Sequence, residues 1–378
     1  MRVGASYNRA MESVDVSIRG SGAVAFSLGL ALARQGLRVA LPSLPPPASV
    51  PDVRAYALNA ASRALLTELR VWDALPADAV TPVYDMHVAG DAAGGAIDFS
   101  SWRQQVEALA WIVDAAELDT GLRTAARFAP HLRLGGGEVE AALTVLAEGK
   151  ESAARTALGV DFKRQPYGQA ALATRLTSNQ PHGGMARQWF KSPDVLALLP
   201  LDRPQPAHSL ALVWSLPSAR AEALQAAPVA DFEQALNEAT GGAAGRLALA
   251  GERASWPLAI AQADRLCGPG WVLIGDAAHV VHPLAGQGLN LGLADVAALS
   301  RVLGGRETWR SLGDEALLRR YVRERAWPTQ AMAGLTDGLL HLFASPQPAL
   351  RELRNRGMTL LNHLAPLKRL LTARALDA

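Results

Sequence analysis

The segment from Val14 to Leu41 constrains the fold more than any other part of the chain. Its first residues, VDVSI, alternate apolar and polar side chains, as a half-buried strand does. The string GSGAVA at residues 20–25 follows, then a helix-length run to Arg34 with Gly36 as its expected C′ residue, and a second apolar strand from Leu37 to Leu41. This order predicts a βαβ unit with a G-x-G-x-x-A turn, in which Gly20 and Gly22 let a dinucleotide approach the helix N-terminus.

The end of that second strand departs from the usual dinucleotide-binding pattern. After Leu41 the chain reads PSLP, without the Asp or Glu that commonly binds the ribose hydroxyls. Ser43 is only a partial substitute for such a carboxylate. We therefore expect fewer contacts on the adenosine side of any bound dinucleotide.

A second strand–turn–helix string, WVLIGDAAHVVHPLAGQGLNLGLAD, occupies residues 271–295. Its apolar strand ends in Gly275-Asp276, which places a carboxylate where open α/β sheets bind ligands. A helix is expected to begin between Gly288 and Asn290, and helix starts offer unpaired N–H groups and a positive dipole end. These residues favour an anionic or electron-rich ligand, although an ordinary strand–loop–helix would use similar glycines for turning.

The whole string resembles the flavin-contacting motif of the FAD-dependent aromatic monooxygenases, specifically the ubiquinone-biosynthesis hydroxylase family. DVRAYAL at residues 52–58, followed by Trp72-Asp73, also resembles that family, and the likeness extends from about Val14 to Leu371. Between these two segments Asn59 is the expected N-cap of a helix, and farther on Asp114 with Glu117 three residues later forms the capping-box-like start of another. The likeness implies an α/β fold like that of para-hydroxybenzoate hydroxylase. That fold has an FAD-binding domain with a mostly parallel, Rossmann-like sheet, an antiparallel substrate-domain sheet and C-terminal helices.

The resemblance also implies a discontinuous domain organisation. Alternating apolar residues at 170–176, 186–190 and 196–199 independently predict antiparallel strands. In that region His182 and Gln188 are catalytic candidates, but a turn histidine and a sheet-face polar residue are the more ordinary interpretations. The expected parts are an FAD-binding domain at 13–80, 103–165 and 252–335, a substrate domain at 81–102 and 166–251, and a C-terminal helical segment at 336–378.

The activity that the resemblance implies is hydroxylation of an aromatic ring, expected to be a prenylated phenol in ubiquinone biosynthesis, through a flavin C4a-hydroperoxide. FAD would be the cofactor, with NAD(P)H or another reductant as electron donor. Because the cofactor supplies the chemistry, no catalytic side chain is assigned and no metal site is expected. The cofactor-binding residues that the resemblance carries over are Gly20, Gly22, Arg54, Gly275, Asp276, Pro283, Gly286, Gly288, Leu289 and Asn290.

Four positions depart from the family pattern on the side expected to hold the ADP moiety. The strand after Leu41 lacks its acid, Ala115-Ala116 replace polar or basic contacts, Glu148 replaces Asp, and Glu151 replaces a basic residue. An alternative function is therefore a family member with a degraded flavin site, acting as a non-catalytic subunit or lipid-binding partner. A flavoprotein oxidoreductase that does not hydroxylate is a third.

Composition bounds the remaining possibilities. The 378 residues carry a net charge of +2, which does not suggest nucleic-acid binding. A single cysteine, Cys267, and the absence of a signal-peptide pattern predict a cytoplasmic protein. The arginine- and leucine-rich tail after Leu339 predicts an amphipathic helix that either packs on protein or lies on a membrane. The expected partners are a hydrophobic aromatic substrate and O2, with peripheral association to the inner membrane or to a quinone-biosynthesis complex.

Overall fold

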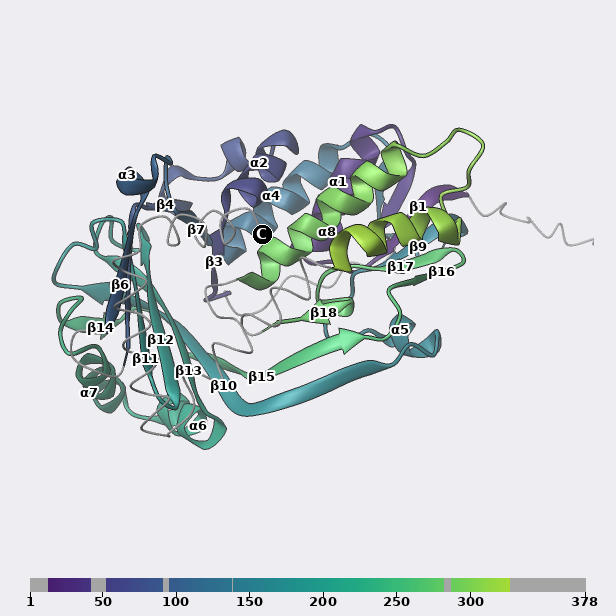
Figure 1. The fold of residues 1–378 in the computed structure, drawn as a ribbon. Coiled ribbons are helices and arrows are strands. Elements are labelled where there is room, and N and C mark those ends of the chain that lie inside the picture. Colours follow the sequence, from purple (N-terminus) through teal and green to yellow (C-terminus); the bar gives the residue numbers. More distant parts are fainter. Residues whose placement is uncertain (1–12, 42–51, 91–94, 138, 282–286, 327–378) are drawn as a thin grey trace, which may run out of the picture.

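The fold is mixed α/β, with a largely parallel and a largely antiparallel sheet, as the sequence predicted (Figure 1). A third, three-stranded sheet in the described residues was not predicted. A largely parallel six-stranded sheet and a largely antiparallel nine-stranded sheet lie on either side of the functional site, and a three-stranded sheet joins them. The computed structural model describes residues 13–41, 52–90, 95–137, 139–281 and 287–326.

The six-stranded sheet forms around the N-terminal βαβ unit. The strands β1, β2, β8, β9 and β17 are parallel, and only β16 is antiparallel to its neighbour. The apolar strands β1 and β2 are buried on both faces, which is typical of parallel sheets covered by helices. Their order is β16 (Cys267–Gly268), β17 (Trp271–Leu273), β9 (Ala141–Leu146), β1 (Val14–Arg19), β2 (Val39–Leu41) and β8 (Leu132–Leu134).

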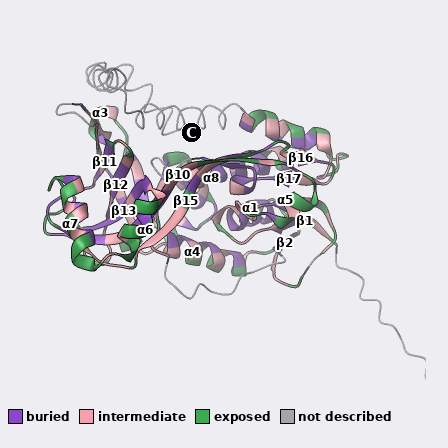
Figure 2. Ribbon diagram, turned by 90° about the horizontal axis from the view of Figure 1, so that it is seen from below, coloured by how far each residue is buried: buried purple, intermediate pink, exposed green. Residues whose placement is uncertain are grey.

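Three helices cover this sheet: α1 (Ala23–Arg34), α4 (Ala115–Phe128) and α8 (Gln287–Gly304). The helix α1 packs against both others, and its residues from Ala25 to Ala33 are buried (Figure 2). It ends at Gln35, followed by Gly36 in the left-handed conformation at φ +81°, as its sequence predicted. The second strand begins at Val39, two residues later than the apolar pattern indicated.

The nine-stranded sheet is antiparallel except where β5 and β11 pair in parallel. Its core includes the fully buried Trp214 and Phe232, under the helices α6 (Ser218–Ala226) and α7 (Val229–Thr240). The three segments predicted as antiparallel strands all lie in it. Its strand order is β18 (His279–Val280), β15 (Ala254–Ala263), β10 (Phe162–Ser178), β13 (Ser209–Pro217), β12 (Asp194–Leu201), β11 (Met185–Lys191), β5 (Asp85–Ala89) and β6 (Ala96–Ser100), and β14 (Leu247–Leu249) also pairs with β10.

The strand β10 is much longer than its alternating pattern predicted. Its pairing with β15 shifts register between Pro166 and Ala170, where Gly168 has a φ of +68°. This bulge bends the strand, so its first part extends away from the body of the sheet toward α5 (Ala153–Ala157), as Figure 1 shows. The long strand thereby connects the two large sheets.

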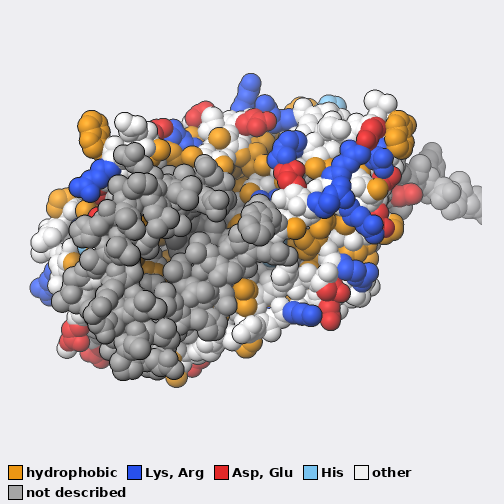
Figure 3. Space-filling model, viewed as in Figure 1, with side chains coloured by type: hydrophobic (Ala, Val, Ile, Leu, Met, Phe, Trp, Pro, Cys, Tyr) orange, Lys and Arg blue, Asp and Glu red, His pale blue; other side chains and the backbone are white. Residues whose placement is uncertain are grey.

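The three-stranded sheet consists of β3 (Ala55–Leu58), β7 (Ala110–Asp114) and β4 (Val80–Val83). Shorter helical elements pack nearby, namely α2 (Ala60–Glu68), η1 (Trp72–Ala74), η2 (Ala77–Ala79) and α3 (Ser101–Gln104), and residues 315–326 form a further helix. Acidic and basic side chains intermix on the surface drawn in Figure 3. Within the described ranges, no helix is both long and apolar enough to span a bilayer.

Candidate functional site

Three parallel strands end at the same level in the six-stranded sheet. Leu146 of β9 is in register with Arg19 of β1 on one side and with Leu273 of β17 on the other. The segments that follow these strands therefore meet at one carboxyl edge, which is the usual ligand-binding edge of an open α/β sheet. A cavity of about 770 Å³ opens at this edge.

The cavity has two chemically different walls. One wall consists of the segments that follow the three strands, at residues 20–24, 147–150 and 274–276. The facing wall comes from the nine-stranded sheet and is apolar. It is lined by Ala173, Ala197, Leu199, Leu212, Val213, Trp256, Leu258 and Ala259.

Most of the site residues expected from sequence lie on this cavity. The lining residues include Gly20, Gly22, Arg54, Gly275, Asp276, Gly288 and Leu289. Pro283 and Gly286 lie outside the described residues.

Asn290 is buried beneath the cavity rather than on its surface. Its Nδ2 donates to the carbonyl of Ala57 at 2.9 Å, and its Oδ1 accepts from Ser62 Oγ at 2.8 Å and from the backbone N–H of Asn59 at 3.1 Å. Asn59 is also the predicted N-cap of α2, because its side chain accepts from the backbone of Ser62. Asn290 thus fixes the first turn of α8 against α2.

The glycines at the cavity are required for different physical reasons. A Cβ on Gly20 would lie 2.2 Å from the carbonyl oxygen of Ala147, so only glycine lets the first loop pack on the end of β9. By contrast, a Cβ on Gly22 or Gly288 would meet no atom within 4 Å. Gly22 precedes α1 and contributes no side-chain cap, so the helix start is open to a ligand.

The Gly275-Asp276 turn is held by a buried acid that the sequence analysis missed. The chain forms a 3₁₀ turn, η3 (Gly275–Ala277), and then the short strand β18, where a continuous loop was expected. Asp295 of α8 is fully buried, and its Oδ2 accepts from the backbone N–H of Gly275 at 2.9 Å and contacts His279 Nε2 at 2.8 Å. Its Oδ1 accepts from Arg325 Nε at 2.7 Å. The sequence did contain a signal for this role, because Asp295 is flanked by apolar residues in α8.

Burial and neighbouring charges shift the pKa values around this turn. Burial raises the pKa of Asp276 above its usual range, and Lys150 is the leading charge that opposes the rise. Burial alone would lower the pKa of His279, but the Asp295 carboxylate outweighs it and raises that pKa. The pair therefore favours a charged imidazole. His279 shares the Asp295 carboxylate with the backbone N–H of Gly275 and so helps to hold the Gly275-Asp276 turn.

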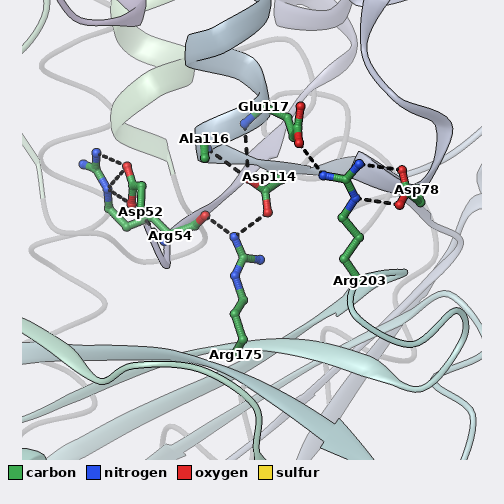
Figure 4. A network of polar contacts seen from close by, with 8 residues as sticks. All are labelled: Asp52, Arg54, Asp78, Asp114, Ala116, Glu117, Arg175 and Arg203. Carbon is green, nitrogen blue, oxygen red and sulfur yellow. Dashed lines mark hydrogen bonds and ion pairs between the residues drawn. The ribbon is translucent and has the colours of Figure 1, made fainter. Parts of the chain in front are cut away.

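Arg54 meets the cavity with its charge already paired (Figure 4). Its Nε donates to both carboxylate oxygens of Asp52 at 2.9 and 3.1 Å, and its Nη2 donates at 2.6 Å. These bonds raise the pKa of Arg54 above its ordinary value. The guanidinium also lies 5.7 Å from the ring centroid of Tyr56, another lining residue.

Arg175 reaches from β10 to the segment that carries Arg54. Its Nη2 donates to the carbonyl of Arg54 at 2.6 Å and to Asp114 Oδ2 at 3.0 Å (Figure 4). Asp114 in turn caps α4, since its other oxygen accepts from the backbone of Ala116 and Glu117. The nine-stranded sheet is thereby tied to the cavity edge by a partly buried ion pair.

The predicted helix start at Asp114 forms only in part. The Asp114 side chain caps the helix as expected. The Glu117 carboxylate does not return to the helix start but accepts from Arg203 Nη1 at 2.5 Å, and Arg203 also pairs with Asp78 at 2.7 Å (Figure 4). Arg203, in the turn after β12, thus binds the Glu117 carboxylate that would form the reciprocal half of a capping box.

The two acidic departures in the segment after β9 are both engaged elsewhere. Glu148 Oε2 accepts from Ser152 Oγ at 2.5 Å and from the backbone of Ala154 at 3.2 Å. Glu151 is exposed and pairs with Arg164 at 2.6 Å. Of the other candidates, His182 binds turn and strand backbone at Gly184 and Leu201, as its ordinary interpretation predicted, and lies away from the cavity.

Known proteins resemble this chain along almost its whole length. A family model described as an FAD binding domain matches residues 13–335. The chain is 30% identical to the ubiquinone hydroxylase UbiL of Rhodospirillum rubrum, over 96% of this chain and 89% of that protein. It is 31% identical to the 3-demethoxyubiquinol 3-hydroxylase of Escherichia coli, over 95% of this chain and 97% of that protein.

A solved structure has the same fold. The crystal structure of a probable FAD-dependent monooxygenase from Pseudomonas aeruginosa superposes with a TM-score of 0.74, covering 92% of this chain and 99% of that one at 21% identity. The fold of this chain is therefore not peculiar to its sequence. The family model and the two relatives decide the assignment: this chain is an enzyme of the FAD-dependent monooxygenase family, with FAD as its cofactor.

Proposed function

We propose that this enzyme hydroxylates the ring of a prenylated phenol in ubiquinone biosynthesis, with O2 as co-substrate and NAD(P)H or another donor as reductant. The two-sided cavity is the observation that carries the proposal. Its strand-end wall offers backbone, glycine and charged groups to a cofactor, whereas its sheet wall offers only apolar side chains. The activities for which the relatives in Rhodospirillum rubrum and Escherichia coli are named support the same substrate class.

The residues at the strand ends fit FAD. The open space at Gly22 and the uncapped start of α1 suit a diphosphate, which helix N-termini bind through their free N–H groups. Asp276 would bind hydroxyls of the ribityl chain, and the start of α8 at Gly288 and Leu289 would lie against the flavin ring. Bound FAD supplies the redox chemistry and the activation of oxygen.

The protein's own contribution is to position the substrate and exclude water. On the sheet side, the lining positions from Ala173 to Ala259 carry no charged side chain, so a neutral aromatic ring with an apolar tail is the ligand they match. Trp256 is the large aromatic group of this wall and would orient the ring by stacking. An apolar wall also strengthens electrostatic interactions between flavin and protein by keeping water away.

The proposal is tested with the purified enzyme loaded with FAD. We expect NAD(P)H-dependent conversion of a phenol with a short prenyl chain, with one oxygen atom from ¹⁸O2 appearing in the product by mass spectrometry. Rapid NAD(P)H oxidation without a hydroxylated product, across phenols of this class, would contradict the proposal and favour a flavoprotein oxidoreductase. A protein that takes up no FAD in a titration would instead favour the non-catalytic alternative.

We further propose that the enzyme associates peripherally with membranes. A prenylated substrate partitions into lipid, and the arginine- and leucine-rich segment at 351–374, which lies outside the described residues, has the composition of an interfacial helix. Flotation of the full chain with anionic and with neutral lipid vesicles tests this. We expect binding to anionic vesicles that weakens with salt, and no flotation with either kind would contradict it.

A further inference from the structure

The segment after β9 carries three charged residues within four positions: Glu148, Lys150 and Glu151. Both acids are already bound by other groups of the protein: Glu148 accepts from Ser152 and from the backbone of Ala154, and Glu151 pairs with Arg164 on the surface. The middle residue, Lys150, lines the cavity. The charge that this segment leaves available to the cavity is therefore positive.

Lys150 lies between the two parts of the strand-end wall. Because β9 is the strand between β1 and β17, the segment that follows it is flanked by the Gly20–Ala23 loop on one side and by Gly275-Asp276 on the other. The influence of Lys150 on the pKa of Asp276 shows that its charge is felt there. Within the part of the chain that the structure describes, no hydrogen bond or ion pair engages its ammonium group.

A buried arginine fixes the backbone that carries this lysine. Arg155 is 4% exposed, and its Nη2 donates to the carbonyl of Lys150 at 2.9 Å while its Nη1 donates to that of Ala277 at 3.0 Å. Its guanidinium stacks on Phe162, 3.6 Å from the ring centroid. Lys150 is thereby held at a set position relative to the Asp276 turn, rather than at the end of a loose loop.

Apart from Lys150, the charged side chains among the described lining residues are either bound by other protein groups or negative. Four lining residues are charged, and Arg54 is paired with Asp52 while Glu148 is bound by Ser152 and Ala154. Of the other two, Asp276 is an acid, which leaves Lys150 to meet an anion. FAD, the cofactor of this family, carries a diphosphate. Helix N-termini such as the start of α1 bind such anions.

We propose that Lys150 binds the diphosphate of FAD and supplies the cationic contact that the departures at Ala115-Ala116 and Glu151 remove. This inference rests on the proposed placement of FAD along the strand ends. A lysine acts here as a point charge, so its contribution depends on charge rather than on bidentate geometry. Loss of the lysine should therefore weaken the binding of flavins that carry the diphosphate and not of those that lack it.

The test compares FAD with riboflavin, which has the same ring but no phosphate. Dissociation constants are measured by flavin fluorescence for the native protein and for the variants Lys150→Gln, Lys150→Arg and Lys163→Gln. We expect Lys150→Gln to weaken FAD binding by roughly 10- to 100-fold, the range for a charge-assisted hydrogen bond, and to leave riboflavin binding unchanged. Lys150→Arg should keep FAD affinity within about 3-fold, because the charge remains.

Lys163 is the matched control, since it is an exposed lysine of β10 that does not line the cavity. Its substitution should leave both affinities unchanged, and the Lys150→Gln defect should shrink at high salt as screening increases. Equal FAD affinity in the native protein and Lys150→Gln would overturn the role of Lys150, as would a parallel loss of riboflavin binding. No FAD binding by the native protein would instead overturn the proposed function itself.

Discussion

Two neighbouring turns in this enzyme are similar in composition but differ in the groups that bind their acids. Gly275-Asp276 follows β17, and Glu148-Gly149 follows the adjacent strand β9. Each combines an acid with a glycine in the left-handed conformation, at φ +59° for Gly275 and +80° for Gly149. Both acids line the same cavity.

The difference lies in what comes next along the chain. Glu148 is followed within six residues by the start of α5, whose free N–H at Ala154 and hydroxyl at Ser152 bind its carboxylate. Asp276 lies within the 3₁₀ turn η3 and is followed by β18, and within the described ranges no hydrogen bond or ion pair engages its carboxylate. The start of α5 thus engages the acid of one turn, whereas among the described residues no helix start engages the acid of the other.

Asp276→Ala should break the comparison most sharply. We expect it to abolish FAD binding, because the carboxylate is the polar group that this turn presents to the cavity. Fluorescence titration measures the loss, and circular dichroism shows whether the variant is folded. Wild-type FAD affinity in a folded Asp276→Ala protein would refute the assignment of this residue.

The next largest effect is expected from the acid beneath the turn. Burial alone would raise the pKa of Asp295, yet His279 and Arg325 hold it below its usual range. Asp295→Asn removes the charge and leaves a buried arginine and imidazole without their counter-ion. We expect the free energy of unfolding to fall by about 3–5 kcal/mol, as measured by urea denaturation.

A matched control for Asp295→Asn is Glu151→Gln, which removes an acid from the exposed pair with Arg164. It should leave the urea midpoint unchanged, because exposed ion pairs in water contribute little to stability. Equal midpoints for both variants would show that the buried network does not hold the Gly275 turn. The buried Asp295 and the exposed Glu151 would then contribute equally to the free energy of unfolding.

Local patterns predicted a good part of this enzyme from sequence. The βαβ unit, the caps at Asn59 and Asp114, and the antiparallel strands follow from periodicity and from side chains that bond their own backbone. Such signals are local, because the atoms involved are a few residues apart. The resemblance to the family was inferred from sequence because one motif matches over a length at which a chance match is not expected.

What the sequence did not reveal depends on long-range contacts. Asp295 and Arg325 are 30 residues apart, and Arg175 reaches Arg54 across 121 positions. Nor could sequence show that Glu148 would be bound by Ser152 and Ala154 while Lys150 kept no such partner among the described residues, since both follow the same strand. Such outcomes depend on which helix start or backbone carbonyl lies within reach after folding.

Glu148→Ala tests the other half of the comparison with a smaller expected effect. The variant removes the carboxylate that accepts from the N-cap Ser152 and from the backbone N–H of Ala154 at the start of α5. Loss of such a contact typically costs about 1 kcal/mol of unfolding free energy. FAD affinity should fall far less than in Asp276→Ala, because the carboxylate is engaged with Ser152 and Ala154. Denaturation and flavin titration measure the two effects, and an equally large loss of FAD binding would make the two turns functionally alike.

The smallest expected effect is a pH dependence of the buried network. The raised pKa of His279 means that the folded protein holds a proton which the unfolded chain releases near pH 6.5, its ordinary pKa. The stability contributed by this proton is therefore complete below pH 6.5 and is lost as pH rises through the folded pKa, by at most about 1.4 kcal/mol per pH unit. Asp295, Arg325 and Asp276 are the charged groups that act on the ring. Urea denaturation between pH 6 and pH 9 should show this slope in the native protein and not in His279→Gln. An NMR titration that placed the pKa of His279 at or below 6.5 would contradict the charged pair with Asp295.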